Sequence, residues 1–288
     1  MYFALTAGLE ILAGISSLVL VALGLAIVFG MMRVINLAHG EFLMMGAYTA
    51  ITAAAHGVNF FVSVLVVAPL VVGLIGLFVE RLIIRHLYGR IVDTMLATWG
   101  LSLLFVGLVT TIFGNTTTGI SSPIGAFTIG SANVSGYKFF IIGVAVVTIV
   151  LLMLLFKKTQ FGLIARATMQ NPQMASAVGV DPKRTYAMTF ALGAALAGLA
   201  GGVMAPITGI VPGIGTTFVA KAFITVIGGG ASVMTGTLTA SAIFGTVNQV
   251  ASFLTTPVFG EVAMLLTAVI LVRLMPQGIT GRYFRGSI

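Results

Sequence analysis

The polar residues most concentrated at the edge of an apolar stretch lie in the segment 36–42, Asn-Leu-Ala-His-Gly-Glu-Phe. If a helix begins here, Asn36 can accept a hydrogen bond from a backbone N–H of the first turn. Asn36, His39 and Gly40 then share one face. Two interpretations are open: a helix cap with interhelical hydrogen bonds, or a glycine-broken helix start that lines a substrate path. His39 and Glu41 are two residues apart and point to different faces, which disfavours a catalytic pair.

The chain lacks the sequence patterns of several classes of enzyme. It has no cysteine, which excludes disulfides, thiolate metal sites and cysteine nucleophiles. It has no His-Glu-x-x-His zinc motif and no Gly-x-Ser-x-Gly nucleophile elbow. It also has no phosphate-binding loop, so another subunit must bind the nucleotide if ATP drives its activity. We therefore expect a chain that is not an enzyme and that itself holds no metal or cofactor.

The composition is that of an integral membrane protein. Of 288 residues, 59% are hydrophobic and only 7% are charged, whereas an ordinary soluble domain carries about 25% charged residues. The mean hydropathy is +1.16. Runs without any charged residue are too long for buried core helices; they are 11–32, 42–79, 94–137, 185–220 and 222–260. We interpret the formal net charge of +8 as loop charge that orients the chain in lipid and not as a nucleic-acid surface.

These runs predict an all-α polytopic protein with about eight or nine transmembrane helices, since about 20 residues cross a bilayer. The predicted spans are 10–31, 36–55, 60–79, 94–113, 139–156, 185–206, 217–235, 238–256 and 259–275. The range 217–235 contains three consecutive glycines and can instead be re-entrant. The loop 114–137 has the composition of turns. No soluble domain is expected, so residues 1–288 form a single transmembrane domain.

The distribution of basic residues predicts the orientation. Twelve of the 14 Lys and Arg residues fall on one side: at 33, in 80–93, in 157–184 and after 272. Because cytoplasmic loops carry the excess of such residues, we expect a multi-pass plasma (inner) membrane protein with its N-terminus outside and its C-terminus in the cytoplasm. Lys138 and Lys221 lie on the outer side, where their side chains can reach the headgroups.

The loop 157–184 contains a short helix with a defined start and end. Asn171 followed by Pro172 is a helix-start signal, and Gly179 and Asp181-Pro182 end the segment. Within it, Met174 and Val178 stack on one side. This apolar patch can lie on the bilayer surface or fill a groove of a partner protein, and the pattern alone does not decide between them.

Glycines and other small residues mark two further features. Gly228, Gly229 and Gly230 cost a helix about 1 kcal/mol each relative to alanine, which requires either close packing or a kink beside a pathway. Small residues at four-residue spacing predict close helix packing in lipid; they are Gly46, Ala50 and Ala54, and Ala194, Gly198 and Gly202.

Few ionisable residues lie within the predicted spans. Glu41, Lys221, Glu261 and Arg273 come near, and all four are close to span ends. An ion-coupled carrier usually keeps an ionisable residue at membrane depth. This disfavours an ion-coupled secondary carrier or a channel that acts alone, but leaves that class open.

Over essentially its whole length the chain resembles the smaller permease subunit of branched-chain, or hydrophobic, amino-acid ABC importers. The matching motifs are residues 33–42, Phe161-Gly162-Leu163 with Ala165-Arg166-Ala167, Met174-Ala175-Ser176 with Gly179-Val180, Lys221-Ala222-Phe223 with Gly228-Gly229, and residues 275–279. The resemblance implies an ABC importer permease fold and import of amino acids by alternating access. It places Asn36, His39, Gly40, Glu41, Gly228 and Gly229 on the substrate path, and Arg166, Met174, Ala175, Val178 and Gly179 at the contact with ATPases.

The resemblance also implies the partners. These are a second, related permease that forms a heterodimer, two cytoplasmic ATPases that hold ATP and Mg²⁺, and a periplasmic solute-binding protein. Membrane lipid surrounds the chain, and no nucleic acid is expected. Similar permeases move urea, short amides or aromatic acids, so these solutes remain alternatives to branched-chain amino acids.

Overall fold

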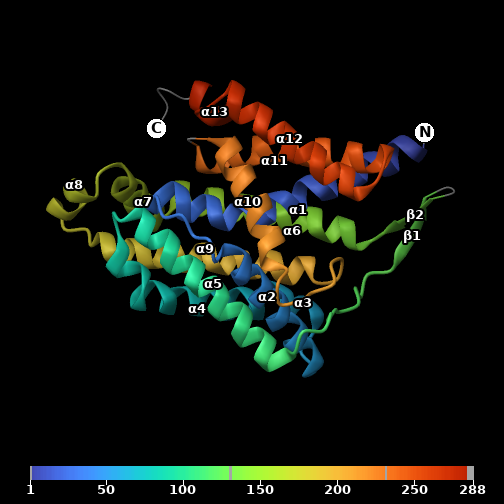
Figure 1. Ribbon diagram of the computed structural model, residues 1–288, viewed down its shortest axis with the longest axis horizontal. Coiled ribbons are helices and arrows are strands. Elements are labelled where there is room, and N and C mark those ends of the chain that lie inside the picture. Colours follow the sequence, from blue (N-terminus) through green and yellow to red (C-terminus); the bar gives the residue numbers. More distant parts are fainter. Residues whose placement is uncertain (1, 130–131, 231, 284–288) are drawn as a thin grey trace. The chain divides into compact units, whose positions relative to one another are not determined.

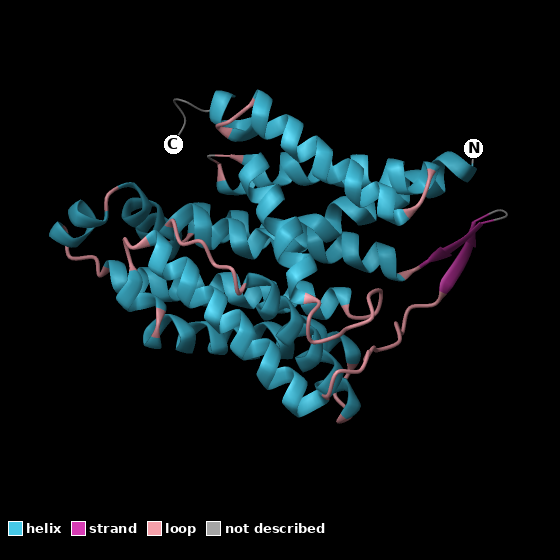
Figure 2. Cartoon of the chain, viewed as in Figure 1, coloured by secondary structure: helices cyan, strands magenta, loops and turns pink. Residues whose placement is uncertain are grey.

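The computed structural model describes residues 2–129, 132–230 and 232–283, and most of these residues are helical (Figures 1 and 2). Arg285, which entered the charge count above, lies outside the described residues. The elements in chain order are α1 (Tyr2–Met32), α2 (His39–Ala55), α3 (Phe60–Val62), the π-turn η1 (Ser63–Val67), α4 (Ala68–Leu82), the 3₁₀ turn η2 (Ile84–Leu87), α5 (Ile91–Phe113), β1 (Ala126–Ile129), β2 (Ala132–Ser135), α6 (Tyr137–Lys158), α7 (Gln160–Gln170), α8 (Pro172–Ala177), α9 (Pro182–Met204), α10 (Gly215–Gly229), α11 (Val233–Leu254), α12 (Pro257–Leu274) and α13 (Gly278–Tyr283).

The helical, multi-pass class predicted from the sequence is confirmed. Eight of the nine predicted spans coincide with helical segments, whereas the predicted span 217–235 runs past the end of α10 at Gly229 and into the start of α11. Among the described residues, six helical segments are long and apolar enough to cross a membrane, and α10 with α11 adds a seventh if this pair, bent by 113°, counts as one span. Helix α2 has 17 residues and is about 26 Å long, slightly less than the ~30 Å hydrocarbon thickness. The predicted number of eight or nine transmembrane helices is roughly consistent with these six or seven candidate spans together with α2.

Three local predictions need correction. Helix α1 starts at Tyr2, so Glu10 lies inside the helix and not at its edge. The loop 114–137 is not turns alone, because β1 and β2 form an antiparallel hairpin with Ala126 opposite Ser135 (Figure 2). The segment 157–184, which is predicted to be cytoplasmic, holds a second helix, α7, that the sequence analysis did not predict. Both omissions concern elements much shorter than a membrane span, which the lengths of uncharged runs do not detect.

Contacts within the chain separate it into two compact units. The first comprises Met1–Ala22, Ser121–Thr148 and Lys221–Ile288, and the second comprises Leu23–Ile120 and Ile149–Ala220. The single-domain organisation expected above stays a prediction.

In the second unit α9 is the central helix, and α4 and α2 are its main neighbours; Figure 1 shows α4 and α9 side by side. The window of α9 that fits a membrane span is 72% buried, compared with 22% for α5. Small residues make this burial possible. A Cβ on Gly46 would lie 2.5 Å from the Cα of Gly198, and a Cβ on Gly202 would lie 3.5 Å from the Cβ of Ala50. The tight helix packing predicted from the small-residue spacing is confirmed.

A π-turn interrupts the helix that covers the predicted span 60–79. Residues 63–67 have the wider π pattern, and Pro69 follows directly in α4. Proline has no N–H to donate and its ring clashes with the carbonyl four residues earlier, so a widened turn before it avoids that clash. The buried Ser63 hydroxyl donates to the carbonyl oxygen of Asn59 at 3.1 Å.

In the first unit, the buried core comes from the start of α1 and from α11 and α12, and its members are Leu18, Ala240, Phe244, Met264 and Ala268. Two ion pairs belong to the same unit. Lys138 pairs with Glu10, and Lys221 pairs with Glu261 at 2.6 Å. The two lysines that the orientation model places outside therefore each have a carboxylate partner, so the unbalanced positive charge is concentrated in the segments predicted to be cytoplasmic.

Candidate functional site

The polar segment 33–41 is a buried connection that leads into α2. Arg33 ends α1 in the left-handed conformation, with φ of +52°, which costs a non-glycine residue about 1–2 kcal/mol. Asn36, His39 and Glu41 are only 3%, 1% and 1% exposed. The predicted cap is displaced: Asn36 Oδ1 accepts from the N–H of Ala38 at 3.1 Å, while α2 starts at His39 without a side-chain cap.

Thr98 of α5 holds this connection in place. The N–H of Leu37 donates to Thr98 Oγ1 at 3.1 Å, and that hydroxyl lies 3.4 Å from the carbonyl oxygen of Ile35. Thr98 is 1% exposed, so the two bonds form away from water, where an unpaired polar group would be costly. Sequence reasoning missed Thr98, because the contact joins residues 61 positions apart.

The first turn of α2 packs against the start of α10 through two glycines. A Cβ on Gly40 would lie 2.5 Å from the carbonyl carbon of Gly215, and a Cβ on Gly215 would lie 2.8 Å from the carbonyl carbon of Gly40. Neither position has space for a side chain. Gly215 was not singled out from the sequence, because its role depends on a residue 175 positions away.

Glu41 is the charged member of this cluster. Its Oε2 atom is buried and has no hydrogen-bond partner among the described residues, and Ser102 of α5 is a hydrogen-bonding neighbour of the carboxylate. The next residue, Phe42, packs edge-on against Phe105 of α5 at 5.7 Å and against Phe190 of α9 at 6.0 Å. The polar helix start therefore lies beside a rigid aromatic cluster that fixes its position.

The glycines at the end of α10, which were assigned to the substrate path, are closely packed. A Cβ on Gly228 would lie 2.7 Å from the Phe244 ring, and a Cβ on Gly229 would lie 2.6 Å from the carbonyl of Gly236. The hydroxyl of Thr280 donates to the Gly229 carbonyl oxygen at 2.6 Å. Of the two explanations for the glycine run, these contacts favour close packing at the end of a helix. These glycines belong to the first unit, whereas the Asn36 cluster belongs to the second.

The segment predicted to contact ATPases is a helical hairpin formed by α7 and α8, which projects beyond the start of α9 (Figure 1). Thr159 caps α7 by accepting from the N–H of Gly162 at 3.2 Å. Asn171 caps α8 by accepting from the N–H of Met174 at 2.9 Å. The helix start predicted at Asn171 and Pro172 is confirmed. Asp181 both follows this segment and caps α9.

Some of the residues predicted to contact the ATPases are exposed on this hairpin, and one of them is buried. Met174 is 63% exposed and Val178 is 75% exposed. Arg166 is also exposed, and Gly179, with φ of +89°, lets the chain turn after α8. Ala175 is only 4% exposed, so its side chain faces the protein interior and does not join the surface formed by Met174 and Val178.

Among the described residues, no group of three or more His, Cys, Asp or Glu side chains is arranged to hold a metal ion. In the Asn36 cluster, Asn36 Oδ1 is engaged with the backbone, whereas Glu41 Oε2 is buried without a hydrogen-bond partner among the described residues.

The chain is similar to known permeases over most of its length. Residues 8–275 match the family model described as the permease component of the branched-chain amino acid transport system. A probable branched-chain amino acid transport permease protein LivH of Methanocaldococcus jannaschii is 31% identical, over 92% of this chain and 88% of that protein. LivH of Salmonella typhimurium is 28% identical and BraD of Pseudomonas aeruginosa is 29% identical, each over 93% of this chain and 92% of the relative.

A solved structure, PsaBC from Streptococcus pneumoniae in complex with Fab, shares the fold. Its TM-score is 0.52 and its sequence identity is 15%, over 96% of this chain and 93% of that chain. Together with the apolar helices, the family match confirms the resemblance inferred from the motifs and the ABC permease fold. These findings establish that the chain belongs to the family of permease components of branched-chain amino acid transport systems.

Proposed function

We propose that this chain is the membrane-spanning subunit of an ATP-driven importer of branched-chain or other hydrophobic amino acids. The observation that carries the proposal is the capped α7–α8 hairpin, which presents Met174 and Val178 to the outside of the chain. The relatives, whose names assign them to branched-chain amino acid transport, support this class of solute. Urea, short amides and aromatic acids are the competing solutes.

Energy enters through a rigid contact in this proposal. The chain holds no phosphate-binding loop, so ATP and Mg²⁺ bind to two partner ATPases. A hairpin capped at both Thr159 and Asn171 transmits a push to α9, because α7 and α8 both contact that helix. Met174 in a groove of an ATPase contributes about 2 kcal/mol if it acts as an interface anchor, and Arg166 adds a charge-assisted bond to a carboxylate.

Aspartate substitutions on α8 test the contact. Met174→Asp and Val178→Asp introduce an unpaired charge into the proposed interface, and we expect ATPase binding to weaken more than tenfold or hydrolysis to be uncoupled from leucine uptake. Ser176→Asp is the matched control, because this exposed residue lies on the opposite face of the same helix. The measurement is copurification of the ATPases and ATP-dependent uptake in liposomes. Normal binding and uptake by Met174→Asp would refute the proposal.

The solute path passes the Asn36 cluster in this proposal. The cluster is buried here, so alternating access requires the contact between Gly40 and Gly215 to open and expose His39 and Asn36. Asn36→Ala and His39→Ala should reduce uptake while the ATPases still copurify. If uptake falls only in proportion to the amount of folded protein, these residues serve packing alone.

The remaining partners follow from the same proposal. A second, related permease completes the membrane part, and a periplasmic binding protein delivers the solute from the side where the N-terminus lies. Reconstitution with both partners and competition of labelled leucine uptake by valine, urea and phenylacetate identifies the solute. Uptake by this chain alone, without ATP, would instead favour an ion-coupled carrier or a channel.

A further inference from the structure

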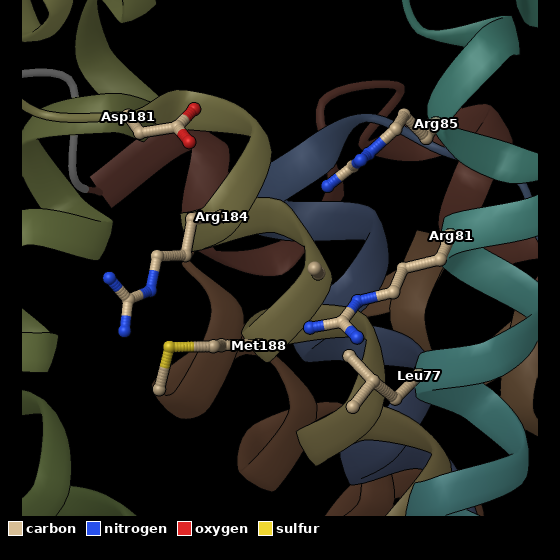
Figure 3. Close-up of a pocket in the computed structure, with 7 residues that line it drawn as sticks. Leu77, Arg81, Arg85, Asp181, Arg184 and Met188 are labelled. Atoms are coloured by element: carbon tan, nitrogen blue, oxygen red, sulfur yellow. The ribbon is translucent and has the colours of Figure 1, made fainter.

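A cavity of about 430 Å³ lies in the second unit, where the end of α4 and the following turn η2 face the start of α9. Six of its lining residues are Leu77, Arg81, Arg85, Asp181, Arg184 and Met188. Figure 3 shows the Arg81 and Arg85 side chains extending from α4 and η2 toward α9, whereas the Arg184 and Met188 side chains extend from the side of α9 that points away from these two arginines. The cavity is therefore basic at one end and apolar at the other.

The positive charge of this cavity is not neutralised within the described part of the chain. None of its three arginines has an ion-pair partner there. Arg85 Nε is buried and has no hydrogen-bond partner among the described residues. Asp181 lines the cavity, but one of its oxygens accepts from the N–H of Lys183 at 3.0 Å as the cap of α9. Three arginines and one aspartate leave an excess of positive charge without a partner.

Glu80 does not supply the missing negative charge to the cavity. It is 0% exposed and accepts a hydrogen bond from the hydroxyl of Tyr88. Burial, together with this hydrogen bond, raises the pKa of Tyr88, which keeps the hydroxyl protonated as a donor to Glu80. One oxygen of the Glu80 carboxylate is thus engaged by Tyr88, and Glu80 is not among the residues that line the cavity.

The apolar end of the cavity continues into a face of α4 suited to lipid tails. Leu70, Leu74, Phe78 and Leu82 follow each other at four-residue spacing and are 56–66% exposed. Leu77 lies one residue before Phe78 on the adjoining face, and across the cavity Met188 is 49% exposed. Arg81 and Arg85 lie at the end of this face, close to Leu82, where the span ends and headgroups begin.

We propose that this cavity binds one anionic phospholipid, with its phosphate at Arg81 and Arg85, Arg184 near the headgroup at the opposite rim, and an acyl chain along Leu77 and Met188. Guanidinium groups bind phosphate oxygens in pairs of parallel hydrogen bonds, and basic pockets between membrane helices suit such headgroups. An acidic surface of a protein partner would satisfy the arginines, but it would leave the adjoining apolar residues without a matching group. The combined lining therefore favours a lipid over a protein.

The test measures retention of phosphatidylglycerol by the purified full-length chain with native mass spectrometry, after exchange from nanodiscs that contain phosphatidylglycerol and phosphatidylcholine. Each arginine near a charged headgroup contributes about 1 kcal/mol, so Arg81→Gln, Arg85→Gln and Arg184→Gln should each reduce retention about fivefold. The triple variant should reduce it on the order of a hundredfold. Arg90→Gln is the matched control. This substitution also removes one positive charge close to the cavity, but Arg90 pairs with Asp93 and does not line the cavity.

Two further measurements separate the sources of phosphate and the kinds of partner. Inorganic phosphate and glycerol 3-phosphate, added in detergent without lipid, should leave the melting temperature of the chain unchanged, whereas phosphatidylglycerol should raise it. Stabilisation by the free phosphates as strong as that by the lipid would overturn the proposal. Unchanged phosphatidylglycerol retention in the triple variant would also overturn the proposal, as would a loss of retention in Arg90→Gln equal to that in the single cavity variants. A loss of ATPase binding in the triple variant with normal lipid retention would show that the arginines bind a protein partner and would overturn it too.

Discussion

The contact between α2 and α9 at Gly46 offers a direct test of the fold, because alanine there should have the opposite effect from alanine at an open glycine. A Cβ on Gly46 would lie 2.5 Å from the Cα and 2.7 Å from the carbonyl carbon of Gly198. Ordinary van der Waals contact begins near 3.4 Å. Both atoms belong to the backbone of α9, so no side chain can rotate away and the helices must separate by at least about 0.9 Å.

The magnitude follows from this separation. A gap of about 0.5–1 Å removes a quarter to a half of the dispersion energy between facing atoms, and overpacking of a tight core costs about 1–3 kcal/mol. Alanine stabilises a helix by up to about 1 kcal/mol relative to glycine. The net expectation for Gly46→Ala is a loss of about 1–2 kcal/mol.

The control is Gly107→Ala on α5, where a Cβ would meet nothing within 4 Å. There the helix-propensity gain stands alone, and we expect a stabilisation of up to about 1 kcal/mol. Unfolding of both variants in mixed detergent, followed by circular dichroism, gives the two free energies. Equal stability of Gly46→Ala and the wild type would show that α2 and α9 are not packed at this distance, and the reasoning would fail.

Three further predictions concern other parts of the chain. Cysteine introduced at Thr117 should react with a membrane-impermeant reagent from outside and at Ser176 only from inside; the reverse pattern would contradict the orientation. Lys221→Met should lower stability by no more than about 1 kcal/mol, because both members of its ion pair with Glu261 are partly exposed; a loss above 2 kcal/mol in thermal melts would show that the pair is shielded from solvent. Thr280→Val removes the hydroxyl that donates to the Gly229 carbonyl and should cost about 1–2 kcal/mol, whereas an unchanged melting temperature would show that this bond is dispensable.

The candidate site was only partly visible in the sequence. Asn36, His39 and Glu41 stood out because polar residues are rare beside an apolar run, and their burial agrees with a specific arrangement. Their partners were not visible. Thr98 and Gly215 are ordinary residues of apolar helices, and they matter because folding brings them to Leu37 and Gly40.

The sequence by itself determined the membrane class, the positions of the helices and the start of α8. These properties depend on composition, on the length of uncharged runs and on local capping, all of which act over a few residues. It also indicated the family, because the motifs lie in order along the chain.

Only the tertiary structure decided how these elements are used. It assigned the glycines of α2 and α9 to one contact, turned Ala175 inward while it left Met174 exposed, and gathered Arg81, Arg85 and Arg184 around one cavity. Several of these contacts join residues more than about 100 positions apart in the sequence. In lipid, helix contacts depend on how well two helix surfaces fit together and not on apolarity, which nearly every helix of the chain shares. Hydropathy therefore locates the helices of this protein, and packing alone selects their neighbours.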